Sequence, residues 1–344
     1  MYNKEFMPPK SWRNIQTHYL EIIDSNWYKL IIDLENLVTV ETYNFYQEQN
    51  MKTMHLPVTT GTISSPMGRG SDSLPVKINL EGVDTYLADS MQFMLEYGCR
   101  LVNNGCFYIM PSFRGEKADE RHLCQFYHSE AEIPGTLMDV MKLVEDYIKY
   151  LSKRILEKYG KNLKEILGDI SHLEKVSSNE FEFKKFSFEE VERYFKENYP
   201  DEFIKYIQYN DGWRNITKEG EKKLVDDFEI VWITNYDAMT VPFYQALDPK
   251  DMSKALNADL LMGIGETVGC GQRHMTYNEV ELSLINHGVS KDEYEWYLKM
   301  KKYYPMQTSG FGLGIERFLI WVLKGDDIRD FQICPRFNGE NIMP

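Results

Sequence analysis

Residues 309–321 read SGFGLGIERFLIW and are the most informative segment of this sequence. Glycines recur at every second position from Gly310 to Gly314, and a backbone without side chains lets a ligand approach closely. The apolar residues that follow have helical spacing, which predicts a buried helix over about 313–323. Arg317 lies in this helix beside the glycines, where its permanent positive charge is suited to a phosphate group. Because glycine-rich turns also occur where a helix simply packs closely on a sheet, the interpretation depends on two further blocks.

The first of these blocks is PSFRGEKADERHLCQFYHSEAE at 111–132, which predicts two antiparallel strands joined by a charged loop. An arginine at the end of the first strand can clamp a carboxylate and a phosphate together, and an exposed phenylalanine on the second can stack on a nucleotide base. The side chains singled out in this block are Arg114, Glu116, Phe126, Glu130 and Glu132.

The other block is DLLMGIGETVGCGQR at 259–273. It places Asp259 and Glu266 seven residues apart in a segment of β type, and Arg273 follows them. Paired carboxylates of this kind are suited to a Mg²⁺ ion that bridges nucleotide phosphates. The three blocks together indicate a site for a nucleotide.

The rest of the chain alternates between helical and extended patterns. Apolar spacing from Leu20 to Leu34 predicts one helix face, and Ser187 with Glu190 forms the start signal of another helix. We expect helices within 11–49, 85–102 and 136–166 and from Ser187 onward, and strands at 107–110, 122–133, 228–234 and 259–268. This order predicts an α+β fold on a mostly antiparallel sheet. We treat residues 1–344 as one domain with a helical insertion at about 136–200.

Composition narrows the class of protein. The 344 residues include 39 basic and 53 acidic ones, a net charge of −14, so non-specific binding to nucleic acid or anionic membrane is disfavoured. The five cysteines include no C-x-x-C pair, which argues against a disulfide framework or a structural zinc site. Without a secretory signal or a stretch of 18 apolar residues, the sequence predicts a soluble cytoplasmic protein.

The three blocks resemble motif 2, the strand before motif 3, and motif 3 of the class II aminoacyl-tRNA synthetases, in particular the asparaginyl and aspartyl branch. FRGE…RHLCQF…EAE is similar to motif 2, GIGETVGCGQR to the GIGE-x-x-GGSQR of asparaginyl enzymes, and GFGLGIER to motif 3. IRDFQICPR at 328–336, LADSMQ at 87–92 and a motif 1 proline at Pro57 extend the similarity. The resemblance covers about residues 30–344 and implies the class II catalytic core.

The resemblance implies roles for the matching residues. Arg114 and Arg317 would be the catalytic residues, with Arg114 at the α-phosphate and Arg317 at the terminal phosphate. Glu116 would bind the adenine amino group, and Phe126 would stack on the adenine ring. The whole implied ATP site consists of Arg114, Glu116, Arg121, His122, Phe126, Glu266 and Arg317. Asp259 and Glu266 would bind Mg²⁺. The amino acid would contact Ser90, Gln92, Glu130, Glu132 and Arg273.

Two positions favour an amide side chain over a carboxylate in the substrate. Aspartyl enzymes have a lysine where this chain has Leu95, and an aspartate where this chain has Glu130. Asparaginyl enzymes have a glutamate at the second position, as this chain does. A substrate carboxylate would meet only Arg273, whereas an amide offers its oxygen to Arg273 and its nitrogen to Glu130. Asparagine or a similar amide therefore fits better than aspartate, as substrate or as product.

The chain also departs from the asparaginyl pattern. Gln125 replaces a glutamate before the stacking phenylalanine, Cys270 and Gly271 replace the last two residues of GGS, and an acidic residue of the motif 1 loop is replaced near Ser65. These changes predict an altered pocket, with a different substrate or a different fate of the adenylate.

We expect a ligase that uses ATP and Mg²⁺ to activate an aspartate- or asparagine-like amino acid as its adenylate. Because motif 1 already lies near residues 30–57, there is no room for the N-terminal anticodon-binding barrel of the family, so ammonia or another small nucleophile is the preferred acceptor. One alternative is a truncated asparaginyl-tRNA synthetase that charges tRNA or a tRNA-like partner. The other is a non-catalytic sensor of amino acid or nucleotide. Motif 1 also implies a homodimer, while binding of whole tRNA is doubtful.

Overall fold

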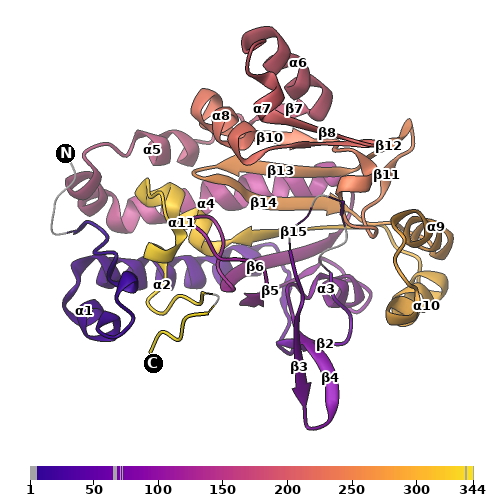
Figure 1. Ribbon diagram of the computed structural model, residues 1–344, viewed down its shortest axis with the longest axis horizontal. Helices are drawn as coiled ribbons and strands as arrows, with labels where there is room; N and C mark the ends of the chain where they lie inside the picture. The colour runs from indigo at the N-terminus through magenta and orange to yellow at the C-terminus, as the bar shows by residue number, and fades with distance from the viewer. Residues whose placement is uncertain (1–5, 65–67, 70, 72, 338, 344) are drawn as a thin grey trace.

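An eight-stranded sheet forms the centre of the molecule, in the order β1-β5-β6-β15-β14-β13-β10-β7 (Figure 1). The computed structural model describes residues 6–64, 68–69, 71, 73–337 and 339–343. The outermost pairs, β1–β5 and β10–β7, are parallel, and the pairs between them are antiparallel, which confirms the predicted fold class. The strands are β1 Lys52–Thr53, β5 Cys106–Phe113, β6 Gln125–Pro134, β7 Lys184–Ser187, β10 Ile230–Thr234, β13 Asn257–Met262, β14 Gly265–Gln272 and β15 Thr308–Gly314.

Helices α2, α4 and α11 cover one face of this sheet, and α8, α9 and α10 lie around the rim of the other (Figure 1). The helices are α1 His18–Asp24, α2 Asn26–Glu48, α3 Gln92–Gly98, α4 Leu137–Leu167, α5 Ser171–Ser177, α6 Phe188–Asn198, α7 Phe203–Tyr206, α8 Lys218–Phe228, α9 Tyr277–His287, α10 Glu295–Tyr303 and α11 Ile315–Leu323. None of them, within the described part of the chain, has both the length and the apolar character needed to cross a membrane.

Three small sheets complete the fold. They are the three-stranded sheet β2 Thr59–Thr60, β4 Val83–Leu87 and β3 Val76–Leu80, the hairpin β8 Ile207–Asn210 with β9 Trp213–Ile216, and the pair β11 Leu247–Asp248 with β12 Asp251–Ala255. The β3–β4 ribbon projects from the body of the molecule (Figure 1).

The main core lies between the sheet and the helices α2, α4 and α11. Helix α4 starts at a capping box in which Thr136 and Asp139 satisfy each other's backbone amides, and it buries residues such as Val144 and Ile148. The sheet contributes Leu260 and Phe311 to the same core. The description of 136–200 as an insertion stays a prediction, although α4 is packed on the centre of the sheet and β7 is the last strand of that sheet.

Three sequence expectations need correction, two in helices and one in a strand. The single helix face from Leu20 to Leu34 is wrong, because Ser25 ends α1 and caps α2, and Leu20 is 54% exposed whereas Leu34 is buried. The helix expected within 85–102 is confined to α3, and Leu101, which we expected on its apolar face, lies outside it and is exposed. The start signal at Ser187 is confirmed, since it caps α6 with Glu190.

The segment 259–268 is not one strand but parts of two. Gly263, which has a positive φ of 63°, turns the chain between β13 and β14. Asp259 therefore lies opposite Gly269 on the neighbouring strand, and Glu266 is brought back towards it. The turn explains how carboxylates seven residues apart meet.

A buried ion pair connects α3 to α10, about two hundred residues later in the chain. Lys301 donates to the Glu96 carboxylate and to the His274 carbonyl oxygen, and the Tyr297 hydroxyl donates to Glu96 at 2.7 Å. Both Lys301 and Glu96 are fully buried. Removing one member leaves the other charged and unpaired in the interior.

We therefore expect Lys301→Met to lower the free energy of unfolding by about 3 kcal/mol in chemical denaturation. The control is Lys299→Met on the same helix, which removes an exposed pair with Glu295 at 3.0 Å and should change stability by less than about 0.5 kcal/mol. Equal effects of the two substitutions would show that the buried pair does not hold α10 in place.

Candidate active site

Glycines cover the centre of the sheet face opposite α4. Residues paired directly across neighbouring strands point to the same face. Here Gly269 is paired with Gly312, and Gly271 with Gly310. On the next strands, Gly269 is paired with Asp259 of β13 and Gly312 with Glu130 of β6. In the same way, Gly271 is paired with Asn257 and Gly310 with Glu132. Carboxylates from both flanking strands can therefore extend over a floor that has no side chains of its own.

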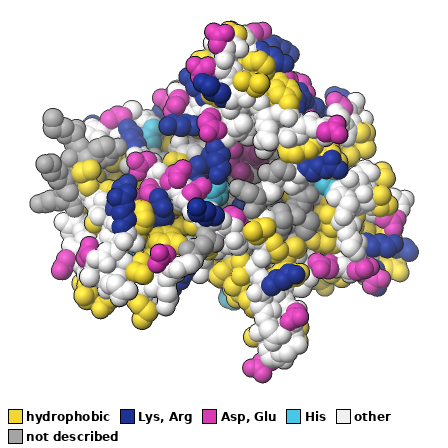
Figure 2. Space-filling model, viewed as in Figure 1, with side chains coloured by type: hydrophobic (Ala, Val, Ile, Leu, Met, Phe, Trp, Pro, Cys, Tyr) yellow, Lys and Arg dark blue, Asp and Glu magenta, His cyan; other side chains and the backbone are white. Residues whose placement is uncertain are grey.

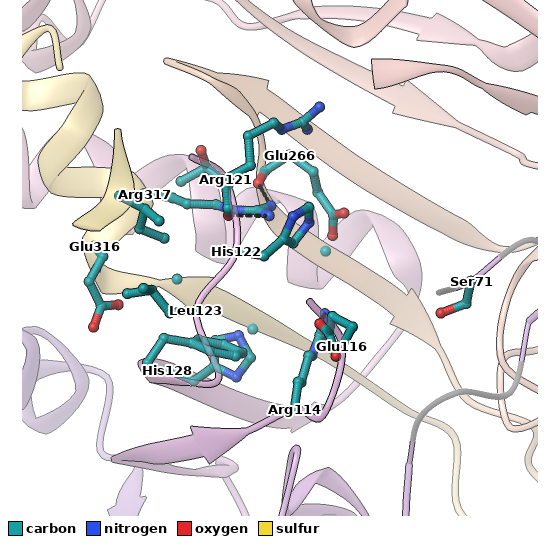
Figure 3. Close-up of a pocket in the computed structure, with 16 residues that line it drawn as sticks. Ser71, Arg114, Glu116, Arg121, His122, Leu123, His128, Glu266, Glu316 and Arg317 are labelled. Atoms are coloured by element: carbon teal, nitrogen blue, oxygen red, sulfur yellow. Dashed lines mark hydrogen bonds and ion pairs between the residues drawn. The ribbon is translucent and has the colours of Figure 1, made fainter. Parts of the chain in front are cut away.

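Two connected cavities of about 230 and 350 Å³ lie over this floor and share Arg114, Glu266 and Gly312. In the space-filling view the face is hollowed near its centre, with Lys, Arg and His side chains beside the hollow (Figure 2). The smaller cavity is lined by all the residues of the implied ATP site, namely Arg114, Glu116, Arg121, His122, Phe126, Glu266 and Arg317. Figure 3 shows Glu266 and Arg317 on one side of it and Arg114 and Glu116 on the other.

Strands β5 and β6 position the residues at one wall. The Arg114 guanidinium lies 5.4 Å from the centre of the Phe126 ring, and its Nη1 is 3.9 Å from a carboxylate oxygen of Glu116. His128 follows Phe126 by two residues, so its ring lies on the same face and contacts the Phe126 ring edge-on at 4.7 Å. This wall offers a flat aromatic surface next to a cation.

The opposite wall is built around Arg317 at the start of α11. Its guanidinium donates to the backbone oxygens of Glu266 and Arg121, which fixes it between β14 and the loop that leads to β6. Arg121 forms an ion pair with Glu221 of α8, and His122 Nδ1 is hydrogen-bonded to Asp119 Oδ1 at 2.8 Å. Arg317 therefore has a fixed position at the edge of the cavity.

Asp259 and Glu266 converge over Gly269. A Cβ atom placed on Gly269 would lie 2.7 Å from Glu266 Oε1 and 3.6 Å from Asp259 Oδ1. Burial and the charges of Glu266 and Glu221 raise the pKa of Asp259 well above its ordinary value. A divalent cation would relieve this repulsion, so the pair fits Mg²⁺. Within the described ranges no cluster of three or more His, Cys, Asp or Glu residues could hold a metal by itself, and phosphates and water would supply the remaining ligands.

The larger cavity extends towards α3 and is lined by Ser90, Gln92, Glu130 and Arg273, four of the five residues of the implied amino-acid site. Glu130 is buried and accepts hydrogen bonds from Ser90 Oγ at 2.6 Å and from the Tyr108 hydroxyl, with His128 Nδ1 at 3.1 Å. Burial alone would raise the pKa of Glu130, but the hydrogen bonds from His128, Ser90 and Tyr108 and the charge of His128 hold it below its ordinary value. Glu130 therefore presents a negative charge to the cavity.

Glu132 is the exception among the implied residues. It is fully buried, does not line the cavity, and binds Arg273 with Nη2–Oε2 and Nε–Oε1 distances of 3.0 and 3.1 Å. Its carboxyl carbon lies 2.6 Å from where a Cβ of Gly310 would be, so it fills the space that this glycine leaves. Glu132 holds Arg273 in place and neutralises its charge.

Several residues around the cavities were not predicted. His128 shares the period-2 face of Phe126 and Glu130, and that alternation could have indicated it. Glu221, Tyr244 and Gln245 also line the larger cavity, but they come from segments without a recognised motif. No local signal in the sequence distinguishes these three.

The departures from the family pattern lie on different faces of the sheet. Gln125 faces away from the site and lines a separate cavity of about 450 Å³ together with Glu35, Glu316 and Arg336. Cys270 is part of the main core and also lines the larger cavity. Gly271 is on the face with the cavities, and Ser65 lies outside the described residues. Gly271 bears on the site through Gln245, whose side chain fills the space next to this glycine and lines the larger cavity.

The chain matches the family model described as tRNA synthetases class II (D, K and N) over residues 12–338. It is 34% identical to the asparagine–tRNA ligase of Pyrococcus furiosus over 263 residues, which are 73% of this chain and 56% of that protein. The corresponding enzyme of Thermococcus kodakarensis is 33% identical, with 73% of this chain and 57% of the relative covered. The chain thus spans little more than half the length of these relatives.

Solved structures agree with this result. The asparaginyl-tRNA synthetase of Pyrococcus horikoshii in complex with asparaginyl-adenylate superposes with a TM-score of 0.82 at 25% identity, covering 99% of this chain and 74% of that one. The asparaginyl-tRNA synthetase of Entamoeba histolytica, also with asparaginyl-adenylate, gives a TM-score of 0.81 at 22% identity over 97% and 75% of the two chains, which shows the same fold.

The close packing of Glu132 on Gly310 gives a test of the glycine floor. We expect Gly310→Ala to lower the free energy of unfolding by about 3 kcal/mol, because the new methyl group meets the Glu132 carboxylate and lies 2.7 Å from the Ala131 backbone oxygen, which disturbs a buried ion pair. Gly314→Ala is the matched control on the same strand. Its Cβ comes no closer than 3.7 Å to Arg317, so the expected loss is under about 1 kcal/mol. If Gly310→Ala and Gly314→Ala have the same free energy of unfolding, the fold does not require glycine at position 310.

A pH dependence of stability follows from Glu35, which lines the separate cavity with Glu316. Burial and the charge of Glu316 raise the pKa of Glu35 from 4.5 to about 8. The unfolded chain releases this proton near pH 4.5 and the folded chain near pH 8, so stability falls as pH rises between these values. Glu35→Gln should reduce the loss of unfolding free energy between pH 5 and 8 by more than about 1 kcal/mol.

The control for that experiment is Asp33→Asn, which removes an exposed charge from the same helix. It should leave the pH profile of denaturant unfolding unchanged. A Glu35→Gln profile that coincides with the Asp33→Asn profile would contradict the raised pKa.

Proposed function

Since the chain belongs to the class II tRNA synthetases of the D, K and N group, we propose that it is a ligase that activates an asparagine-like amino acid with ATP. The product of this step is the aminoacyl adenylate, and pyrophosphate leaves. The observation that carries the proposal is that Arg114 lines two adjoining cavities, one lined by the Phe126 ring and the other by Glu130.

The chemistry needs no general base. A carboxylate oxygen of the amino acid attacks the α-phosphorus of ATP, and the bond from that phosphorus to the pyrophosphate oxygen breaks. In this proposal Phe126 stacks on the adenine, Glu116 binds its amino group, and Arg114 neutralises the charge on the α-phosphate. Arg317 holds the terminal phosphate. Positioning and preorganised charge therefore lower the barrier.

Asp259 and Glu266 would hold Mg²⁺, which supplies positive charge to the phosphate oxygens as pyrophosphate departs. Glu221 lies close enough to raise the pKa of Asp259, and Arg121 neutralises Glu221 through their ion pair.

Two kinds of acceptor for the activated amino acid are compared, namely tRNA and a small nucleophile. The relatives named above are tRNA ligases, so the doubt about whole tRNA as a partner is not supported. Ammonia or another small nucleophile stays a prediction, as does the homodimer. One experiment with both kinds of acceptor separates them.

We predict ATP–pyrophosphate exchange that depends on asparagine and on Mg²⁺. Arg317→Ala should reduce exchange at least about 100-fold, because it removes a preorganised charge from the transition state, with an unchanged circular dichroism spectrum. Arg193→Ala, which removes an exposed arginine of α6, is the matched control and should retain full exchange. Retention of exchange by Arg317→Ala within threefold would refute the assignment.

The same assay decides between the alternatives. Absence of exchange with asparagine, aspartate and their analogues would leave a non-catalytic sensor. If exchange occurs, radiolabelled amino acid is incubated with ATP and either ammonia or total tRNA. Labelled acid-precipitable RNA identifies a tRNA ligase, and a labelled small amide identifies a small-acceptor ligase.

A further inference from the structure

Gly271 leaves a space that a side chain from another segment fills. Gly271 lies on β14, on the face of the sheet that forms the floor of the site. A Cβ atom at this position would collide with Gln245 Oε1 and lie 2.7 Å from Gln245 Cδ. A serine here, as in the GGS of the asparaginyl pattern, would have to displace the Gln245 amide. Glycine at 271 and the placement of Gln245 are therefore coupled.

The backbone around Gln245 is held firmly. Gln245 forms an isolated antiparallel bridge with Arg273, and the backbone N–H of Gln245 donates to the backbone oxygen of Pro242 at 3.0 Å. The next residue, Ala246, donates to the Gln272 oxygen at 2.8 Å. These bonds fix the segment against the end of β14, so the Gln245 side chain points into the larger cavity that also contains Glu130 and Arg273.

Gln245 Oε1 is a buried acceptor that has no hydrogen-bond partner among the described residues. Leaving such a group unsatisfied costs about 1–3 kcal/mol, so a ligand that supplies a donor gains free energy by binding there. The Gln245 side chain lines the larger cavity, whose volume of about 350 Å³ is in the range of small-molecule sites.

The other polar groups of the pocket favour the same kind of ligand. Glu130 is ionised and accepts hydrogen bonds, and the charge of Arg273 is neutralised by Glu132. Asp89 also lines the cavity and accepts from Ser64 Oγ at 2.8 Å. A substrate side chain that carries N–H donors meets acceptors here, whereas a carboxylate would meet a second carboxylate in Glu130.

We propose that Gln245 determines specificity at this site by accepting a hydrogen bond from an N–H group of the substrate side chain. The substrate class is an amino acid whose side chain ends in a primary amide, with Glu130 and Gln245 as the two acceptors. This inference rests on the proposed function, because it concerns the amino acid that the adenylation site selects.

The test compares asparagine with its methyl ketone analogue, 2-amino-4-oxopentanoate, in which a CH₃ group replaces the NH₂ group. ATP–pyrophosphate exchange is measured with both compounds for the wild type, Gln245→Met and Gly271→Ser. Gln47→Met, which replaces an exposed glutamine of α2, is the matched control. We expect Gln245→Met to raise the KM for asparagine about tenfold with little change in kcat, since the lost bond serves binding.

The analogue separates recognition from a structural effect. If Gln245 recognises the N–H group, Gln245→Met leaves the KM for the ketone unchanged. The ratio of kcat/KM for asparagine to kcat/KM for the ketone then falls about tenfold. Gly271→Ser should act in the same direction because it displaces the Gln245 amide. An equal rise in KM for both compounds, or no change for either, overturns the proposal.

The outcome is separable from that of the proposed function. If the wild type shows no exchange, direct binding of asparagine and the ketone is measured by calorimetry in the same variants. Tighter binding of asparagine that Gln245→Met weakens supports the role of Gln245 without adenylation. Equal binding of both compounds, or no binding of either, overturns that role as well.

Discussion

The site depends on the absence of side chains from the middle of two neighbouring strands. Gly269, Gly271, Gly310 and Gly312 form adjacent pairs on one face of β14 and β15, so the sheet has a bare floor between flanking strands that carry carboxylates. Side chains from elsewhere occupy part of the space above these glycines. Glu132 lies over Gly310, and Gln245 over Gly271, while Glu266 and Asp259 converge over Gly269. The same glycines on a solvent-exposed strand would only weaken it. Here they let charged groups from distant segments approach one another.

Much of this arrangement can be predicted from the sequence, because it follows from periodicity. The spacing of the glycines at 310, 312 and 314 places them on one face of a strand, and Phe126, Glu130 and Glu132 share a face for the same reason. That alternation also reaches His128, which was not predicted. Family resemblance adds the roles of Arg114 and Arg317, whose positions beside one cavity agree with it.

The remaining residues could not be predicted because long-range contacts place them. Glu221 reaches the site by pairing with Arg121 across a hundred residues of chain, and Gln245 by a bridge to Arg273. Helix propensity or strand alternation around either residue gives no indication of these partners. Arg273 shows the reverse case: its presence is predicted, but its pairing with Glu132 and the resulting loss of free positive charge are visible only in the structure. The departures at Gln125 and Cys270 likewise become interpretable once the face each occupies is known.

The central claim is that two adjoining cavities form one site, with the nucleotide at Phe126 and Arg114 and the amino acid at Glu130 and Gln245. The most direct test is a crystal structure of the protein with the stable adenylate mimic asparaginyl-sulfamoyl-adenosine. The account predicts adenine against the Phe126 ring, the sulfamoyl group beside Arg114, and the side-chain amide nitrogen within hydrogen-bond distance of Glu130 and Gln245 Oε1. An adenine bound away from Phe126, or an amide nitrogen that faces neither acceptor, would contradict it.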